Sequence, residues 1–457
     1  MSIPLNGRIA IIDNELDQAL PLMKVFAKNN IPYVFYKGDD LTFLPDGKSR
    51  FNDIRLLFLD INLLNSRTAT AKEIKSTLFS VIRAVISEKN FPYSLVYWSK
   101  QEKEYSNVVK DLFANELNDR RPIELIPFVK SDFFPNFSDT ETDNDIDLIA
   151  EIEKIINAQH SYSYLLEWEN VVHKAADETL QEVFSSYHEF EDWANNANYI
   201  LEKLGNAYLG NHYNENTSDE KIKASFISFN SVFKDTLEHS VYTKDILNAV
   251  DLTYDKSKVV GKLNSINEKL NLSMDVMNIA ESGNILVLEN ADEKFFGALL
   301  FKLLSKIQFG NYLRQQQKEI TEIQLNSLAN RELKKIKDKI KASWIKIEMV
   351  VTPICDYVQK SNNIYNRIVK GLLILSEYKM FIDEKSEAIF VLPITINYKD
   401  KEYILILDFR YFYTTEEINA VNSKPVFRLR QELLAEVQSR LARHISRQGI
   451  LFLDERE

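Results

Sequence analysis

The chain has 457 residues, of which 45% are hydrophobic and 27% are charged, and its formal net charge is -11. This composition excludes fibrous and disordered classes and predicts a globular protein of roughly two to four domains. The negative net charge argues against a surface that binds nucleic acid throughout, so we expect no nucleic-acid partner.

The sequence shows no sign of secretion or membrane insertion. Its first residues lack a basic region followed by a long apolar core, and no apolar run approaches the roughly 20 residues of a membrane helix. Cys355 is the single cysteine, so neither a disulfide framework nor a thiolate metal cluster can form within one chain. We therefore expect a cytoplasmic protein that does not associate with membranes.

Proline placement divides the chain into three parts. All 11 prolines lie at or before Pro135 or at or after Pro353, which leaves residues 136–352 without one. Because a proline costs about 3 kcal/mol in a helix interior, this span predicts an all-α helical middle. The acidic, turn-rich run 138–145 is the expected linker. The predicted domains comprise residues 1–140, 141–343 and 344–457.

Strands and helices are predicted to alternate in the first domain. The expected strands lie at residues 8–13, 32–36, 54–63, 94–99 and 123–129, and the expected helices lie at 15–29, 72–88 and 102–117. Strict alternation of this kind predicts a parallel sheet with helices on both faces. We therefore predict a doubly wound α/β domain with five parallel strands.

The strand expected at residues 54–63 carries an unbroken apolar run that ends in Asp60. Such a run is typical of a strand that is buried on both faces, and open α/β sheets bind ligands at the carboxyl ends of their strands. Asp13 and Ser99 close two other predicted strands, and Lys130 follows a third. These side chains are therefore predicted to converge at one edge of the sheet.

The order of these elements resembles the receiver domain of two-component response regulators. In that family an acidic pair closes the first strand, a phosphate-accepting aspartate closes the third, a Ser or Thr closes the fourth, and a lysine follows the fifth. The segments that resemble those elements are Arg-Ile-Ala-Ile-Ile-Asp-Asn-Glu at 8–15, Leu-Phe-Leu-Asp-Ile-Asn-Leu at 57–63, Leu-Val-Tyr-Trp-Ser at 95–99 and Pro-Phe-Val-Lys at 127–130. The resemblance covers residues 1–135.

The resemblance implies a phosphorylation site that uses Mg²⁺. Asp60 would be the nucleophile and a metal ligand, Asp13 would hold Mg²⁺ directly or through water, and the backbone carbonyl of Asn62 would be a third ligand. Lys130 would pair with a phosphoryl oxygen, and Ser99 would hydrogen-bond the attached phosphoryl group. A cation is needed because an ionised aspartate must meet an incoming anion.

Three positions depart from the family pattern. Asn14 replaces the second acid and removes one carboxylate from the predicted metal site, for which Glu15 is the candidate substitute. Ser131 stands where the family usually has a proline, and Pro127 stands where an aromatic residue is common. Two interpretations therefore remain open. The domain either accepts a phosphoryl group on Asp60 or serves, unphosphorylated, as a docking module.

The middle region is expected to consist of packed amphipathic helices. Apolar residues recur at three- and four-residue spacing in segments such as 164–172 and 180–184. His173 lies in this pattern, but the residues after it do not continue a histidine-kinase motif, so a structural or exposed histidine is favoured. The other histidines of the region, at 160, 188, 212 and 239, lack the spacing of a zinc site.

The third domain is predicted to have an α+β fold. Its β-rich segments lie at residues 344–352, 371–375, 388–397 and 402–412, and a hairpin turn is expected at 399–401. An amphipathic helix should follow, with an apolar stripe at 433, 434, 437, 441 and 445, arginines at 440, 443 and 447 on another face, and Gly449 as its end. Cys355, Asp356 and His444 are the only candidates for a nucleophilic site here, and a packing role for Cys355 is favoured.

We expect a signalling protein whose phosphodonor is another protein. The chain has 11 glycines and neither a G-x-G-x-x-G nor a P-loop motif, so we do not expect it to be a kinase or ATPase itself. Its long output region loosely resembles that of atypical receiver proteins found in bacterial operons with Hsp90-like or histidine-kinase-type ATPases, some of them suspected of antiphage defence. That resemblance implies a partner kinase or Hsp90-like ATPase, and a homo-oligomer is compatible with it.

Overall fold

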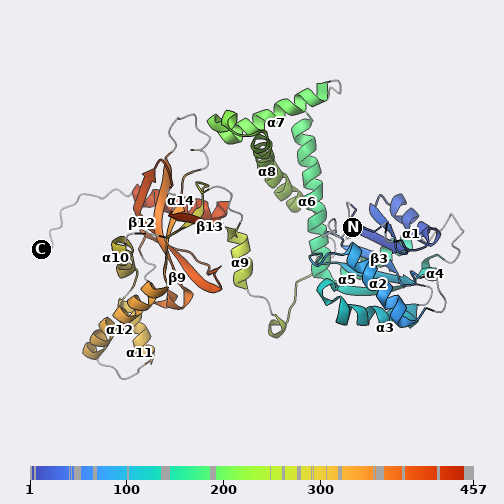
Figure 1. Ribbon diagram of the computed structural model, residues 1–457, viewed down its shortest axis with the longest axis horizontal. Coiled ribbons are helices and arrows are strands. Elements are labelled where there is room, and N and C mark those ends of the chain that lie inside the picture. The colour runs from blue at the N-terminus through green and yellow to red at the C-terminus, as the bar shows by residue number, and fades with distance from the viewer. Residues whose placement is uncertain are drawn as a thin grey trace. The chain divides into compact units, whose positions relative to one another are not determined.

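The computed structural model contains two compact units (Figure 1). The first consists of Met1–Tyr199 and Ile227–Tyr254, and the second of Ile200–Phe226 and Asp255–Glu457. The structure describes residues 3–4, 7–40, 42, 44–45, 53–64, 69–99, 102–134, 145–185, 192–246, 249–259, 263–274, 279–289, 291, 293–304, 306–316, 322–353, 356, 365–382, 386–418 and 422–446.

Five parallel strands form the sheet of the first unit, in the order β2-β1-β3-β4-β5, which confirms the predicted α/β class. They are β1 (Ile9–Asp13), β2 (Tyr33–Lys37), β3 (Leu56–Asp60), β4 (Ser94–Ser99) and β5 (Glu124–Val129). Because the strand order reverses between β1 and β3, the crevice that binds ligands in such sheets lies at the carboxyl ends of these two strands. Pro127 lies in β5, an edge strand, where a missing N–H is tolerated.

Helices cover both faces of this sheet, as the blue and cyan part of Figure 1 shows. They are α1 (Leu16–Lys28), α2 (Ala71–Val85), α3 (Glu102–Asp111), α4 (Lys130–Phe133), α5 (Asp145–Ala158) and α6 (His160–Phe184). A π-helical turn, Leu112–Glu116, and a 3₁₀ turn, Asn118–Arg120, follow α3. Ala10 and Ile12 share a core with α2 and α3, whereas Ile9 and Ile11 share one with α1, α5 and α6. The alternation of these β1 side chains explains why both faces are covered.

The core of the first unit extends past the predicted domain boundary at residue 140. Leu148 and Ile152 of α5 and Tyr162 and Leu166 of α6 are buried in the same cluster as β1 and α1. The hydroxyl of Tyr162 also donates a hydrogen bond to the backbone carbonyl of Arg55. The acidic run near residue 140 therefore does not separate two cores.

Glu169 of α6 pairs with two arginines that precede β1 and β3. Its Oε2 lies 2.7 Å from Arg8 Nη1, and its Oε1 lies 2.8 Å from Arg55 Nη2. His173 Nε2 lies 2.6 Å from Arg8 Nη2. Burial, and then the positive charge of Arg8, lower the pKa of His173. This contact supports a structural role for His173 rather than phosphotransfer.

We expect Glu169→Ala to destabilise the first unit by about 2 kcal/mol, because it leaves two mostly buried guanidinium groups without their anion. Hydrogen exchange of the α6 and β1 amides measures the loss. Glu182→Ala, at an exposed position of the same helix, is the control and should cost less than about 0.5 kcal/mol. Equal losses of stability in the two variants would show that the ion pairs of Glu169 do not stabilise the first unit.

The chain passes from one unit to the other within each of two long helices, α7 (Trp193–Leu209) and α8 (Ser218–Thr243). Ser225 Oγ of α8 donates a hydrogen bond of 2.6 Å to the Leu201 carbonyl of α7. These helices agree with the prediction for the middle region. No helix in the part of the chain that the structure describes is both long and apolar enough to cross a membrane.

The second unit is built on an antiparallel sheet in the order β10-β12-β9-β8-β7-β13-β6, with β11 paired to β12. Its strands are β6 (Leu272–Ser273), β7 (Asn284–Leu288), β8 (Ile345–Val350), β9 (Asn366–Leu375), β10 (Ile389–Val391), β11 (Ile396–Tyr398), β12 (Lys401–Thr415) and β13 (Ser423–Leu429). The prediction of an all-α middle is therefore wrong at β6 and β7, which join this sheet. Central strands exclude proline as helices do, so a proline-free span does not distinguish the two.

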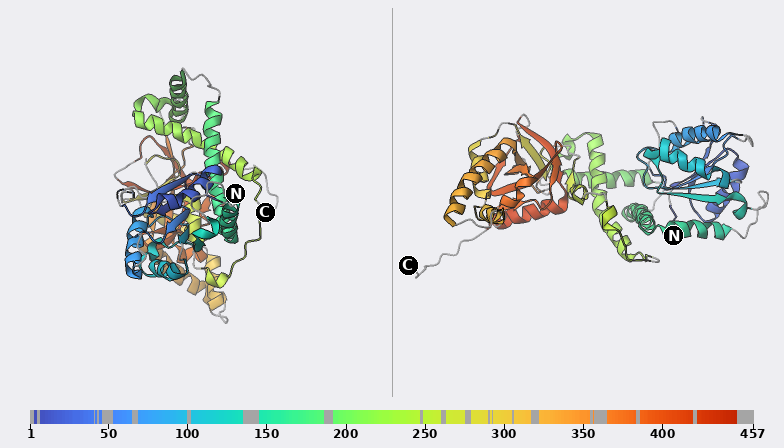
Figure 2. Two further views of the ribbon diagram at one scale, coloured as in Figure 1. Left: turned by 90° about the vertical axis from the view of Figure 1, so that its right-hand side faces the viewer. Right: turned by 90° about the horizontal axis from the view of Figure 1, so that it is seen from below.

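Helices lie on both faces of the second sheet, as the orange and red parts of the right view of Figure 2 show. They are α10 (Glu293–Leu303), α11 (Lys306–Gln316) and α12 (Glu322–Ser343) on one face and α14 (Gln431–Ile445) on the other, while α9 (Leu263–Asn271) precedes β6. Leu434, Val437 and Leu441 of α14 are buried, whereas Arg440 and Arg443 are exposed. The predicted amphipathic helix is confirmed except at Ile445, which is 57% exposed near the end of the helix. Arg447 and Gly449 lie outside the described residues.

The predicted hairpin turn joins β11 to β12. Tyr398 pairs with Lys401, and the two residues between them, Lys399 and Asp400, have positive φ values of 49° and 61°. Two successive residues with positive φ are the mark of a type I′ turn, whose twist matches that of the flanking strands.

Candidate functional site

Lys130 bridges two aspartates at the carboxyl edge of the parallel sheet. Its Nζ lies 2.8 Å from Asp13 Oδ2 and 3.0 Å from Asp60 Oδ2. Asp13 is 0% exposed, Lys130 1% and Asp60 5%, so the ion pairs are shielded from water and Asp60 has the most access to solvent. The structure thus brings together three of the predicted site residues.

Strand register explains how these side chains meet. Ile12 of β1 is level with Leu59 of β3, so the residues that follow them, Asp13 and Asp60, close neighbouring strands. Asp13 Oδ1 accepts a hydrogen bond of 3.0 Å from the Glu15 amide, and Asp60 Oδ1 accepts one of 3.2 Å from the Asn62 amide. Each carboxylate therefore uses one oxygen to hold its own loop and the other to bind Lys130.

Among the described residues of this cluster, two carboxylates face one ammonium group. Burial, and then the negative charge of Asp60, raise the pKa of Asp13 to about 6, while Lys130 and the Glu15 amide act in the opposite direction. Ionisation of Asp13 therefore lowers the stability of the folded state, and binding of a second cation or of a proton would reduce that loss.

Asn14 directly follows Asp13, at the position where the resemblance to receiver domains led us to expect a second acid. It is 4% exposed, and its Nδ2 has no hydrogen-bond partner among the described residues. The Glu15 carboxylate accepts a hydrogen bond from the Gln18 side chain in the first turn of α1. Within the described part of the chain, no group of three or more His, Cys, Asp or Glu side chains could hold a metal ion.

The donors that are present nevertheless fit a hard divalent cation. The Asp13 and Asp60 oxygens already converge on one cation, the Lys130 ammonium. The side-chain oxygen of Asn62 is buried without a partner in the described part of the chain. Mg²⁺ commonly binds to proteins through one or two carboxylates and keeps several of its waters. The two carboxylates of this site are therefore enough protein ligands for it.

The other candidate residues are Ser99, Cys355, Asp356 and His444. Ser99 closes β4 level with Val129, as predicted for the backbone, but its side chain lies outside the described residues. Cys355 also lies outside them. Asp356 pairs with Arg367 at 2.7 Å, and the ring of His444 lies 6.3 Å from that of Phe409. These contacts give no support to a nucleophilic site in the second unit.

Comparison of the chain with protein-family models, with curated proteins and with solved structures gave no match.

Proposed function

We propose that the first unit is a receiver-type signalling domain that accepts a phosphoryl group on Asp60. The observation that carries this proposal is that Lys130 bridges Asp13 and Asp60 at the switch point of the sheet. The resemblance of residues 1–135 to response-regulator receivers points the same way.

In the proposed reaction an Asp60 oxygen attacks the phosphorus of a donor. A bond forms between that oxygen and phosphorus, the phosphorus–oxygen or phosphorus–nitrogen bond of the donor breaks, and the leaving group takes the electron pair. Bound Mg²⁺ would neutralise charge between the carboxylates and the incoming anion. Asp13 and Asp60 would hold the ion, and Lys130 would exchange a carboxylate oxygen for a phosphoryl oxygen.

Lys130 would couple phosphorylation of Asp60 to a conformational change at α4. It is the first residue of α4 and directly follows β5. When its ammonium group moves from Asp13 and Asp60 to a phosphoryl oxygen, the start of α4 would move with it. The donor would be a partner kinase or Hsp90-like ATPase, since no nucleotide-binding motif occurs in this chain.

We expect the full-length protein to gain one phosphoryl group from acetyl phosphate in the presence of Mg²⁺, measured by intact mass. Asp60→Ala should reduce the gain to background, because it removes the attacking oxygen. Asp132→Ala, an exposed aspartate on α4 beside the site, is the matched control and should behave as the wild type does. No label on the wild type, or full label on Asp60→Ala, would contradict the proposal.

The second candidate function is an unphosphorylated docking module, favoured by Asn14. With one acid fewer, the site would hold Mg²⁺ more weakly, and Lys130 already supplies a counter-ion to both carboxylates. This candidate predicts a stable complex with a partner protein that is unaffected by Mg²⁺, by acetyl phosphate and by Asp60→Asn. Affinity purification of the wild type and of Asp60→Asn from the source cells distinguishes the two functions.

A further inference from the structure

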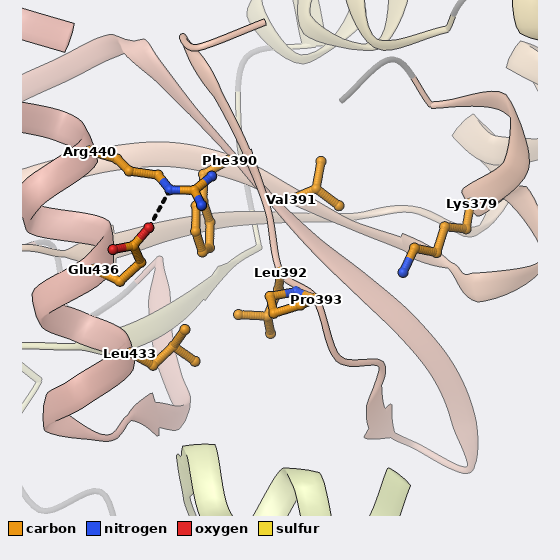
Figure 3. A pocket seen from close by; sticks show the side chains of 8 residues that line it. All are labelled: Lys379, Phe390, Val391, Leu392, Pro393, Leu433, Glu436 and Arg440. Carbon is orange, nitrogen blue, oxygen red and sulfur yellow. Dashed lines mark hydrogen bonds and ion pairs between the residues drawn. The ribbon is translucent and has the colours of Figure 1, made fainter. Parts of the chain in front are cut away.

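A groove of about 340 Å³ lies between strand β10 and helix α14 of the second unit (Figure 3). Phe390 and Leu392 are buried at its base, and Val391 and Leu433 are partly exposed. None of the lining residues belongs to the Asp60 site, so binding at the groove can be measured without phosphorylating the protein. Its volume lies at the low end of the range for small-molecule pockets, enough for a few side chains.

The backbone beside this groove is the open edge of a sheet. β10 is the last strand of the sheet order, and no other described strand pairs with its outer side. The Leu392 amide donates to the Leu405 carbonyl at 2.9 Å, and the Phe409 amide donates to the Ala388 carbonyl at 2.8 Å. Since these bonds alternate along an antiparallel strand, the N–H and C=O of Val391 point away from β12. Among the described residues, none forms a backbone hydrogen bond with them, so they can pair with another strand.

Two cations stand on opposite sides of the apolar groove, Arg440 on α14 and Lys379 across from it (Figure 3). Arg440 Nε lies 2.6 Å from Glu436 Oε1, and its guanidinium carbon lies 5.2 Å from the centre of the Phe390 ring. Among the described lining residues, Glu436 therefore offsets one of the two positive charges, and one positive charge remains. The groove is complementary to an occupant that is apolar and carries negative charge.

We propose that this groove binds an extended segment of a partner protein, which adds a strand to β10 and has apolar residues beside an acidic one. The added strand would bond to the N–H and C=O of Val391, its apolar side chains would cover Phe390 and Leu433, and its carboxylate would lie between Lys379 and Arg440. A second copy of this chain fits less well, because pairing two β10 strands would bring identical cations together.

The test uses the full-length protein and a fluorescein-labelled peptide of alternating leucine and threonine that ends in two aspartates. Fluorescence anisotropy should show saturable binding, about tenfold weaker when both aspartates are replaced by asparagine. Val391→Pro removes the outward N–H without removing a bond to β12, so it should weaken binding at least about tenfold. Arg440→Ala should also weaken it, whereas Arg443→Ala, an exposed arginine of α14 outside the groove, should not.

Circular dichroism checks that each variant is folded. If Val391→Pro does not fold, the double variant Lys379→Glu, Arg440→Glu replaces it and should prefer a peptide that ends in two lysines. The proposal is overturned if the wild type does not bind the acidic peptide, or if it binds the asparagine peptide equally well. It is also overturned if the folded Val391→Pro variant binds normally, or if sedimentation equilibrium shows a dimer that Val391→Pro dissociates, since the groove then serves a second copy.

Discussion

Lys130→Met should destabilise the first unit by about 3–5 kcal/mol at about pH 8, the cost of removing one partner from a buried ion cluster. The ammonium group is the one cation that contacts both Asp13 and Asp60 in the described structure, and all three side chains are almost fully buried. Methionine has an apolar side chain nearly as long as that of lysine, so packing changes little. The loss of stability then measures the effect of leaving the two carboxylates without a positive charge.

The loss caused by Lys130→Met should shrink as the pH falls. Without the ammonium group, the two carboxylates repel each other and one takes up a proton, which removes the unpaired charge. Urea titrations followed by hydrogen exchange of the β1 and β3 amides measure this unit alone. Lys110→Met, at an exposed position of α3, is the control and should change stability by less than about 0.5 kcal/mol. A Lys130→Met loss below that of the control, or one that does not vary with pH, would refute the charge argument.

Asp13→Asn should become more stable relative to the wild type as the pH rises. The pKa of Asp13 is about 6 in the folded protein, against 3.8 for a free aspartate. Between these values the folded state binds more protons than the unfolded state, so the Asp13 contribution to stability falls as the pH rises. Asparagine has no proton to lose. The difference in unfolding free energy should therefore move by up to about 3 kcal/mol in favour of Asp13→Asn between about pH 4 and pH 7.

Hydrogen exchange of the β1 and β3 amides at several pH values measures this difference. Above about pH 7 it should level off, because Asp13 is then ionised in both states. Asp17→Asn, at an exposed position on α1, is the control and should show no comparable change. If the difference in unfolding free energy between Asp13→Asn and the wild type is constant over the whole pH range, burial and the charge of Asp60 do not raise the pKa of Asp13.

Prediction from the sequence succeeded where the signal was local. The apolar run before Asp60 and the alternation of strands and helices define five parallel strands, and the stripe of α14 defines its buried face. The hairpin at Lys399 and Asp400 belongs to the same class, because the turn depends on the residues within it. In each case the pattern lies in residues that are close together in the sequence.

The failures arose where distant segments pair. Nothing in the sequence of β7 indicates that it pairs with β8 and β13. Proline placement also could not distinguish this strand from a helix. The sequence also gave no sign that Glu169 would meet Arg8 and Arg55, or that α5 and α6 would complete the first core. The groove beside β10 was missed for the same reason, because its cations come from Lys379 and from Arg440 on α14.

The sequence by itself determined which chemical groups stand at the ends of which strands: Asp13, Asp60 and Lys130 were identified from apolar runs that end in charge. Only the tertiary structure decided that one ammonium group contacts both carboxylates, with Asn14 beside them and the Glu15 carboxylate bonded to Gln18. The physical reason is that strand identity depends on local apolar patterning, whereas distances between side chains depend on register and burial across strands far apart in the chain.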